Sequence, residues 1–445
     1  MTSLRDAALA IFRAGLKAGH VGSLLRQAVS LAGLRLSVGP AAFDLARIRR
    51  LLVLGAGKAS GAMAQVLEEI LADRIFQGVV VVKDGYTAPT QRIRLLEAGH
   101  PIPDERGARA ARELLALAQS GREDDLVVVL ISGGGSALTP APVSPITLAE
   151  KQVLTERLLT RGAAISELNA VRKHCSEIKG GQLARAAAPA PVVSLILSDV
   201  IGDPLDVIAS GPTAPDDTTF ADALAVLDRF GLRARVPPSV LHHLEQGARG
   251  EIPETPKAAD PVFRRVTNHV MGNNAPVVAA AASKARQLGF NTHLLTSWLQ
   301  GEARVAAGQF ADLARQIRSH GKPVPPPACL IAGGETTVTV VGKGKGGRCQ
   351  EFCLAGALYL QGIENVCILA AGTDGSDGPT EAAGAIADGQ TVSRGVRRGV
   401  NTSASLREND SFGFFSALGD LVTTGPTNTN LLDLYLLLVG PLPPK

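Results

Sequence analysis

A short, wholly apolar run that leads straight into a loop of glycines and charged residues occurs repeatedly along this sequence. Runs of this length with flanking glycines are typical of buried strands. Four of them lie in the first half of the chain, at residues 51–54, 79–82, 126–131 and 192–197. Because helical segments follow several of the loops, the pattern predicts an α/β protein with a Rossmann-like parallel sheet and flanking helices.

The length of the chain and one proline-rich segment indicate two domains. At 445 residues the chain exceeds the size of a usual single core. Residues 237–261 are rich in proline and charge and form the best candidate for a domain edge. We therefore predict an N-terminal Rossmann-like domain at residues 1–240 and a smaller C-terminal α/β domain at residues 241–445. The active site is expected in the cleft between them.

The composition excludes several classes of function. Aromatic residues make up only 4% of the chain and the net charge is +4, which gives no basis for nucleic-acid binding. No apolar run approaches the ~20 residues that a membrane span requires. The five cysteines are odd in number, and no set of Cys and His completes a zinc site. We expect a cytoplasmic protein that is a monomer or a homodimer.

The stretch from Cys329 to Ala385 contains the largest group of candidate functional residues. Its apolar runs at 329–332 and 366–371 lead into Gly333-Gly334-Glu335 and into the loop 372–378, which contains Asp374 and Asp377. Residues 338–341 are predicted to form a further strand, and the glycine- and lysine-rich segment 342–348 leads into a helix at about 349–360. Glycines bring main-chain N–H groups close to an anion. Acids beside such a site would repel a phosphate unless a divalent cation lies between them, so the stretch suggests a nucleotide–Mg²⁺ site for phosphoryl transfer.

Three loops of the N-terminal half fit the same chemistry, each with a structural alternative. Gly55-Ala56-Gly57-Lys58 follows the first apolar run, but it matches neither the dinucleotide fingerprint nor the Walker A motif, and a simple tight turn would also fit. The segment 132–136, Ser-Gly-Gly-Gly-Ser, can form an anion nest or a flexible turn. Asp199 ends another apolar run, where Walker B enzymes hold Mg²⁺, although a capping role is the alternative.

Several of these motifs, in this order, resemble the class II glycerate kinases. GGETTVTV, GGRCQE, AGTDGSDGPTEAAGA and TGPTNTN are similar to the C-terminal domain of that family, which is called MOFRL. GAGKAS, GGGSAL, a basic run of the form NxxRKxxSxxKGG and SDVxGD…SGPT extend the resemblance from about residue 51 to 439. Cys349, Phe412 and Asn428 depart from the residues usual in the family. The resemblance implies that the chain uses ATP to convert D-glycerate into 2-phosphoglycerate.

The resemblance also implies roles for particular residues. Lys58 and Arg348 are expected to contact the transferred phosphate or the glycerate carboxylate, and Asp199 is our choice for the general base or substrate orienter. Asp374 and Asp377, three residues apart, are expected to share one Mg²⁺, although one of them would alternatively cap a helix. ATP and its phosphates are expected at residues of the glycine loops and the basic run: Gly55, Gly57, Ser132, Gly133, Gly134, Gly135, Ser136, Lys179 and Glu335.

Other assignments remain open at this point. In the basic run Arg172 and Lys173 are further candidates for an acidic substrate, and His100 has no assigned role. The rival function is an NAD(P)H-dependent hydroxypyruvate reductase, because a glycine loop follows the first strand. That reading requires an acid about 20 residues past the glycines, whereas Asp84 lies roughly 27 residues after Gly57. A non-catalytic nucleotide-binding protein or sugar-phosphate sensor is a second rival. It would require loss of the acids at the strand ends, yet all four are present.

Overall fold

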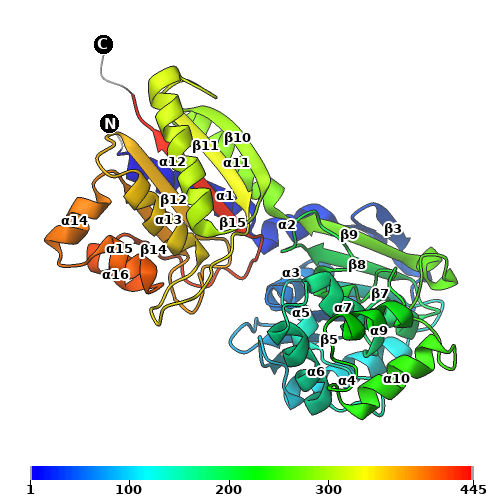
Figure 1. Cartoon of the computed structure of the whole chain (residues 1–445). Coiled ribbons are helices and arrows are strands. Elements are labelled where there is room, and N and C mark those ends of the chain that lie inside the picture. Colours follow the sequence, from blue (N-terminus) through cyan, green and yellow to red (C-terminus); the bar gives the residue numbers. More distant parts are fainter. Residues whose placement is uncertain (1–2, 442–445) are drawn as a thin grey trace. The chain divides into compact units, whose positions relative to one another are not determined.

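The computed structural model describes residues 3–441, which form two compact units (Figure 1). The N-terminal unit comprises Val21–Met271, and the C-terminal unit comprises the chain up to His20 and from Gly272 onward. The predicted fold class, two α/β domains of which the C-terminal one is smaller, is confirmed.

The division lies elsewhere than at residues 240 and 241. Residue 240 falls inside α10 (Pro238–Ala248), which packs on α9 (Phe220–Arg229). The chain then adds one more strand, β9 (Val266–Gly272), beside the N-terminal sheet before it leaves the unit. The first helix, α1 (Leu4–Ala18), belongs to the C-terminal unit because it packs on α11 (Asn274–Gln287).

The N-terminal unit is built on a six-stranded sheet in the order β6-β5-β4-β7-β8-β9, in which the ladders from β6 to β8 are parallel. A small antiparallel sheet of β1, β2 and β3 precedes it. The elements not yet given are α2 (Val21–Ala28), β1 (Val29–Ala32), β2 (Arg35–Val38), β3 (Ala41–Asp44), η1 (Leu45–Arg47), β4 (Leu51–Ala56), α3 (Ser60–Leu71), η2 (Ala72–Arg74), β5 (Ile75–Lys83), β6 (Ile93–Ala98), α4 (Glu105–Gln119), β7 (Leu126–Ile131), α5 (Gly135–Leu138), α6 (Leu148–Thr160), α7 (Ile165–His174), α8 (Gln182–Ala187), β8 (Val192–Leu197), η3 (Ile208–Ser210) and η4 (Pro261–Arg265).

The local sequence explains these elements. Every residue of β7 and β8 is buried, as expected for strands covered by helices on both faces. α4 begins after Asp104, whose carboxylate accepts the N–H of Gly107, and α6 begins with a capping box of Thr147 and Glu150. The four predicted strands of this sheet are confirmed as β4, β5, β7 and β8.

The C-terminal unit contains a mixed sheet in the order β10-β11-β15-β12-β13-β14. The β10–β11 ladder is parallel, and the other ladders are antiparallel. Its remaining elements are β10 (Asn291–Leu299), α12 (Ala303–His320), β11 (Ala328–Gly334), α13 (Arg348–Tyr359), β12 (Val366–Gly372), β13 (Gly384–Asp388), α14 (Thr391–Arg397), α15 (Thr402–Arg407), α16 (Ser411–Leu418), β14 (Leu421–Val422) and β15 (Asp433–Val439). Helices α12 and α13 pack together over a core that includes alternate residues of β11, β12 and β15.

The strand predicted at residues 338–341 does not form. Val340 and Val341 are about three-quarters exposed, and the N–H of Val341 donates to the side chain of Asn409 instead of to a neighbouring strand. Without backbone hydrogen bonds to a neighbouring strand, an apolar run does not form a β-strand. Among residues 3–441, no helix is both long and apolar enough to cross a membrane.

Candidate functional site

The loops that follow β4 and β7 lie side by side at the carboxyl edge of the N-terminal sheet. The N–H of Lys58 donates to the carbonyl oxygen of Gly133 over 2.9 Å. The N–H of Ala59 donates to the hydroxyl of Ser132 over 3.0 Å, and that hydroxyl lies 3.1 Å from the hydroxyl of Ser60. Because ligands of open α/β sheets bind outside this edge, the two loops occupy the expected place for a ligand site.

The glycines of these loops have different functions in the fold. Gly57 has φ +145°, and a Cβ there would lie 2.1 Å from the Ser132 hydroxyl, so only glycine permits the contact between the loops. Gly55 lies inside β4 rather than in the loop, where a Cβ would lie 2.6 Å from the carbonyl oxygen of Leu130. Gly55 therefore serves the packing of the sheet, and its predicted contact with a phosphate has no support from its position.

Lys58, His100 and Gly134 converge on one spot. A Cβ at Gly134, which has φ +87°, would lie 3.1 Å from Nε2 of His100 and 3.3 Å from Cγ of Lys58. Burial and the positive charges of Lys58 and Lys83 lower the pKa of His100 to about 4. The imidazole is therefore neutral at pH 7 beside the Lys58 side chain. His100, to which the sequence analysis assigned no role, is thus part of the candidate site.

A second group of side chains surrounds Ser136, at the start of the short helix α5. Nη2 of Arg172 donates to the Ser136 hydroxyl over 2.6 Å, and Nζ of Lys179 donates to the Ser136 carbonyl oxygen over 2.7 Å. The Ser210 hydroxyl lies 2.9 Å from that of Ser136 and donates to Oδ1 of Asn169. Since a hydroxyl has one hydrogen, the Ser136 hydroxyl donates to Ser210 and accepts from Arg172.

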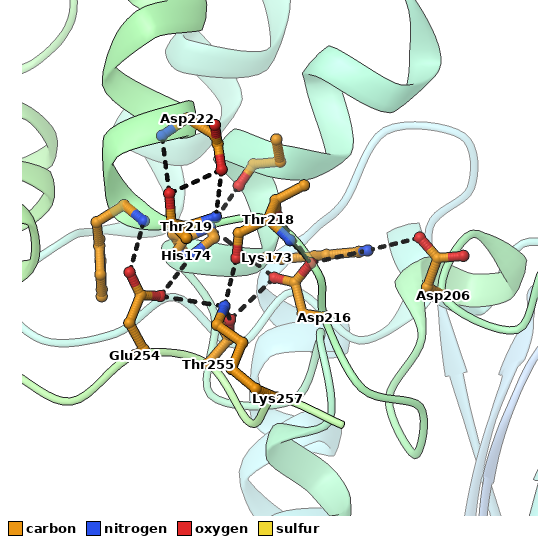
Figure 2. Close-up of polar contacts among 12 residues, drawn as sticks. Lys173, His174, Asp206, Asp216, Thr218, Thr219, Asp222, Glu254, Thr255 and Lys257 are labelled. Carbon is orange, nitrogen blue, oxygen red and sulfur yellow. Dashed lines mark hydrogen bonds and ion pairs between the residues drawn. The ribbon is translucent and has the colours of Figure 1, made fainter. Parts of the chain in front are cut away.

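Lys173 and His174, the neighbours of Arg172 on α7, have different surroundings (Figure 2). Nζ of Lys173 pairs with Asp206 at 3.1 Å and with the fully buried Asp216 at 3.2 Å. The ring of His174 lies between the carbonyl oxygen of Ala170, 2.7 Å from Nδ1, and Glu254, 3.0 Å from Nε2. These contacts hold α7 against the segments near 216 and 254, so both side chains are structural.

Asp199 follows β8, which adjoins β7 in the sheet, and its side chain is half-buried. It lies at the same edge as the loops of Lys58 and Ser136, since the carboxyl ends of parallel strands share one edge. The neighbouring Ser198 hydroxyl accepts the N–H of Val200 and shapes the turn after the strand. The position fits the predicted role in orienting a substrate.

In the C-terminal unit Arg348 is held by two carboxylates. Its Nε and Nη2 donate to the two oxygens of Asp433 over 2.6 and 2.9 Å, and its Nη1 lies 2.7 Å from Glu335. Burial opposes the charge of the guanidinium, but the charge of Asp433 and its hydrogen bonds outweigh burial and raise the pKa of Arg348. The buried Asp433 also accepts a hydrogen bond from the Tyr435 hydroxyl over 3.0 Å. The guanidinium is therefore fixed in place and about one-third exposed.

Asp377 caps a helix. Its two carboxylate oxygens accept the N–H groups of Cys349 (3.1 Å) and Gln350 (2.8 Å) at the start of α13. Burial raises the pKa of Asp377 to about 7 in spite of these bonds. Asp377 therefore has the capping role that was the alternative to Mg²⁺ binding, although the helix that it caps precedes it in the sequence. Its exposed fraction is 3%, which argues against the predicted Mg²⁺ ligand.

Asp374 is the more exposed of the two acids in this loop. It is half-buried, and one of its oxygens accepts the N–H of Ser376 over 2.9 Å. A Cβ added at Gly372 would lie 3.4 Å from Oδ1 of Asp374 and 3.3 Å from Oδ1 of Asp433, so these two acids flank Gly372. Within residues 3–441 no group of three or more His, Cys, Asp or Glu side chains could hold a metal by itself.

The sequence missed two members of the site for different reasons. Asp433 begins the final apolar strand, 85 residues from its partner Arg348, and no local pattern connects the two. Ser210 was read only as part of a motif, yet Ala209, Ser210 and Gly211 all have positive φ, between 51° and 62°. Strain of this kind in non-glycine residues concentrates at functional sites, but only the backbone geometry reveals it.

Known proteins match this chain over nearly its whole length. The model of a domain of unknown function, DUF4147, matches residues 7–245, and that of the MOFRL family matches residues 328–433. The D-glycerate 2-kinase of Thermotoga maritima is 43% identical over 391 residues, 88% of this chain and 91% of that protein. The glycerate 2-kinase of Pyrococcus horikoshii is 42% identical over 88% of this chain and 87% of that protein. A crystal structure of a glycerate kinase from Thermotoga maritima superposes with a TM-score of 0.86 at 40% identity, covering 98% of this chain and 99% of that one.

Glycine loops with a lysine at the carboxyl edge of a parallel sheet are typical of phosphate-binding sites, and the matches identify the class as a phosphotransferase of the kinase type. The similarity over most of the chain also identifies the family. The chain belongs to the glycerate 2-kinase family that carries a MOFRL domain. The predicted family is confirmed.

Proposed function

We propose that this protein transfers the γ-phosphoryl group of ATP to D-glycerate and forms 2-phosphoglycerate. The observation that carries the proposal is the loop of Lys58, which is bonded to the glycine loop after β7 at the ligand edge of the sheet. Its relatives of 42% and 43% identity bear the names of glycerate 2-kinases. The small-molecule substrates follow from this activity.

Phosphoryl transfer needs positioning and neutralisation of charge more than covalent chemistry. We assign Lys58 and Arg348 to the transferred phosphoryl group or to the glycerate carboxylate. Each cation is held in place within its own unit, because Lys58 packs against Gly134 and Asp433 fixes Arg348. Preorganised donors of this kind stabilise charge best in the transition state.

Asp199 takes the proton of the attacking hydroxyl or orients that hydroxyl. A general base must come within hydrogen-bond reach of the proton that it removes. Asp199 is half-buried at the edge that also carries Lys58, which supports this assignment. The neutral imidazole of His100, whose pKa is lowered to about 4, adds a hydrogen-bonding group without adding charge beside Lys58.

The acids of the C-terminal unit suit Mg²⁺ in part. Mg²⁺ commonly takes one or two carboxylates and completes its shell with water and phosphate oxygens. Asp374 fits this requirement, whereas Asp377 is engaged by α13, so we assign the metal to Asp374 alone. When bound, Mg²⁺ would neutralise negative charge on the nucleotide phosphates.

Two parallel assays test the function. The purified protein is incubated with ATP, MgCl₂ and D-glycerate, and separately with NADH or NADPH and hydroxypyruvate. We expect formation of ADP and 2-phosphoglycerate, identified by ³¹P NMR against the 2- and 3-phosphate standards, and no oxidation of the nicotinamide. Oxidation of NAD(P)H without formation of ADP would establish the reductase instead.

A further inference from the structure

The turn that leads into β15 has a strained backbone, and each of its three carbonyl groups is bound. Leu432 has φ +65°, a left-handed conformation that a leucine rarely adopts. Its carbonyl oxygen accepts the N–H of Thr373 over 3.0 Å and the Thr373 hydroxyl over 2.7 Å. The carbonyl oxygens on either side, of Leu431 and Asp433, both accept from Nδ2 of Asn274, over 2.7 and 3.2 Å. Strain of this kind persists only where the surroundings fix the backbone, and here Thr373 and Asn274 fix it.

The side chain of Asn274 is not needed to begin its own helix. Asn274 is the first residue of α11 and is 4% exposed. The preceding residue, Asn273, caps the helix, because its side chain accepts the N–H of Ala275 over 3.0 Å. An amide nitrogen has two hydrogens, and the turn before β15 takes both from Asn274.

The oxygen of the same amide lies against the end of β11. Oδ1 of Asn274 is buried and has no hydrogen-bond partner among residues 3–441. A Cβ added at Gly333 would lie 1.5 Å from this oxygen, so only glycine fits there. A buried polar atom without a partner lowers stability, so packing of α11 alone does not account for an amide at this position.

Both segments that Asn274 touches carry a carboxylate that holds Arg348. Asp433 ends the strained turn and accepts two hydrogen bonds from the guanidinium, over 2.6 and 2.9 Å. Glu335 follows Gly333 and Gly334 at the end of β11 and lies 2.7 Å from Nη1 of Arg348. Gly334 and Asp433 are also paired in the β11–β15 ladder. A movement of the turn would therefore move the guanidinium.

We propose that Asn274 is a positioning residue for phosphoryl transfer. Its amide fixes the turn at Leu432, the turn fixes the carboxylate of Asp433, and this carboxylate fixes Arg348. The inference rests on the proposed kinase function, in which Arg348 contacts the phosphoryl group or the glycerate carboxylate. Asn274 itself touches neither substrate in this assignment.

Two alanine variants of neighbouring residues separate positioning from general stability. Asn274→Ala removes both donors to the turn, and a shift of the guanidinium by less than 1 Å should lower kcat/KM about tenfold. Val277→Ala is the matched control, since Val277 is fully buried on the same helix and packs on Gly15 and Gly19 of α1. It leaves a cavity and should lower Tm as well, with kcat/KM within about twofold of the wild type. ADP formation is measured well below the Tm of every variant.

The position of Arg348 is measured directly by ¹H–¹⁵N NMR of the arginine side chains. Its Nε–H donates to Asp433 over 2.6 Å, a short charge-assisted bond that should shift the proton resonance downfield and slow its exchange with water. Arg348→Lys identifies the resonance by its loss. Asn274→Ala should move the signal upfield and speed the exchange, whereas Val277→Ala should leave both unchanged.

Three results would overturn the positioning role. They are an unchanged Arg348 signal in Asn274→Ala, a changed signal with wild-type kcat/KM, and equal losses of kcat/KM in Asn274→Ala and Val277→Ala. A wild-type protein that forms no ADP with D-glycerate would instead refute the proposed function, and the NMR comparison would still decide whether Asn274 places Arg348.

Asn274→Asp replaces the alanine variant if that protein does not fold. The substitution keeps the size of the side chain but sets a carboxylate against two carbonyl oxygens, which raises the pKa of the new carboxyl. Its protonated form can donate one hydrogen bond to the turn. The ratio of its kcat/KM to that of the wild type should therefore rise as pH falls, and a ratio that does not change with pH would refute the proposal.

Discussion

Replacing Gly134 by alanine should damage catalysis more than stability. Gly134 has φ +87°, where an L-residue costs roughly 1–2 kcal/mol relative to glycine. The new methyl group would also lie 3.1 Å from the His100 ring and 3.3 Å from Cγ of Lys58, so these side chains must give by a few tenths of an ångström. A misplacement of about 1 Å costs about 100-fold in rate, so a smaller shift should lower kcat/KM about tenfold.

Gly162 provides the matched control for this effect. It lies in the same unit with φ +77°, and a Cβ there would meet nothing within 4 Å. Gly162→Ala should therefore show a similar loss of stability, about 2–8 °C in Tm for a unit of this size, with kcat/KM within about twofold of the wild type.

The assay is ADP formation under varied D-glycerate, together with thermal unfolding of the wild type and both variants. The comparison removes the backbone cost, which the two alanines share. If Gly134→Ala and Gly162→Ala lose the same Tm and keep the same kcat/KM, the position of Lys58 and His100 beside Gly134 does not matter for turnover. That outcome would refute a catalytic role for this contact.

Three further predictions follow from the site. Lys58→Ala should lower kcat/KM at least about 100-fold, the scale for removal of a preorganised donor, and near-wild-type turnover would exclude its role. Asp374→Asn should need much more Mg²⁺ and recover in part at saturation, whereas Asp199→Asn should stay slow at every Mg²⁺ concentration; the reverse pattern in a Mg²⁺ titration would exchange the two roles. The pKa of Asp377 is raised to about 7, so the folded state binds this proton more tightly than the unfolded state does. The free energy of unfolding should therefore fall as pH rises from about 4 to about 7. Tm of Asp377→Asn minus Tm of the wild type should therefore increase across that range, and a decrease would mean that the N–H groups of α13 control the titration.

The sheets could be predicted from the sequence because both faces of their strands are covered. A strand such as β7 is apolar at every position, and that pattern needs no knowledge of the partner strand. Local caps could be predicted for the same reason, since Asp104 and Thr147 bond within three residues. The exposed segment 338–341 has the same apolar character, but its partner is the distant Asn409, and the prediction of a strand there was wrong.

The site was harder to predict than the fold because its contacts are distant in sequence. Motifs identified Lys58 and Arg348 as candidates, but the carboxylate that fixes Arg348 comes from Asp433, at the start of a strand near the end of the chain. Asp374 and Asp377 look equivalent in the sequence. Only the packing of α13 on the loop shows that one of them is taken up by backbone N–H groups.

The placement of β15 has a consequence for how the protein is made. This strand, Asp433–Val439, lies in the interior of the C-terminal sheet, paired with β11 on one side and β12 on the other. A ribosome delivers it after both of its neighbours in the sheet, and long after the α1 helix that packs on it. The whole of Val21–Met271 leaves the ribosome before this sheet can close. A nascent chain that stalls before residue 433 would therefore expose the edges of β11 and β12 to pairing with other chains, and it would also lack the carboxylate that Arg348 requires.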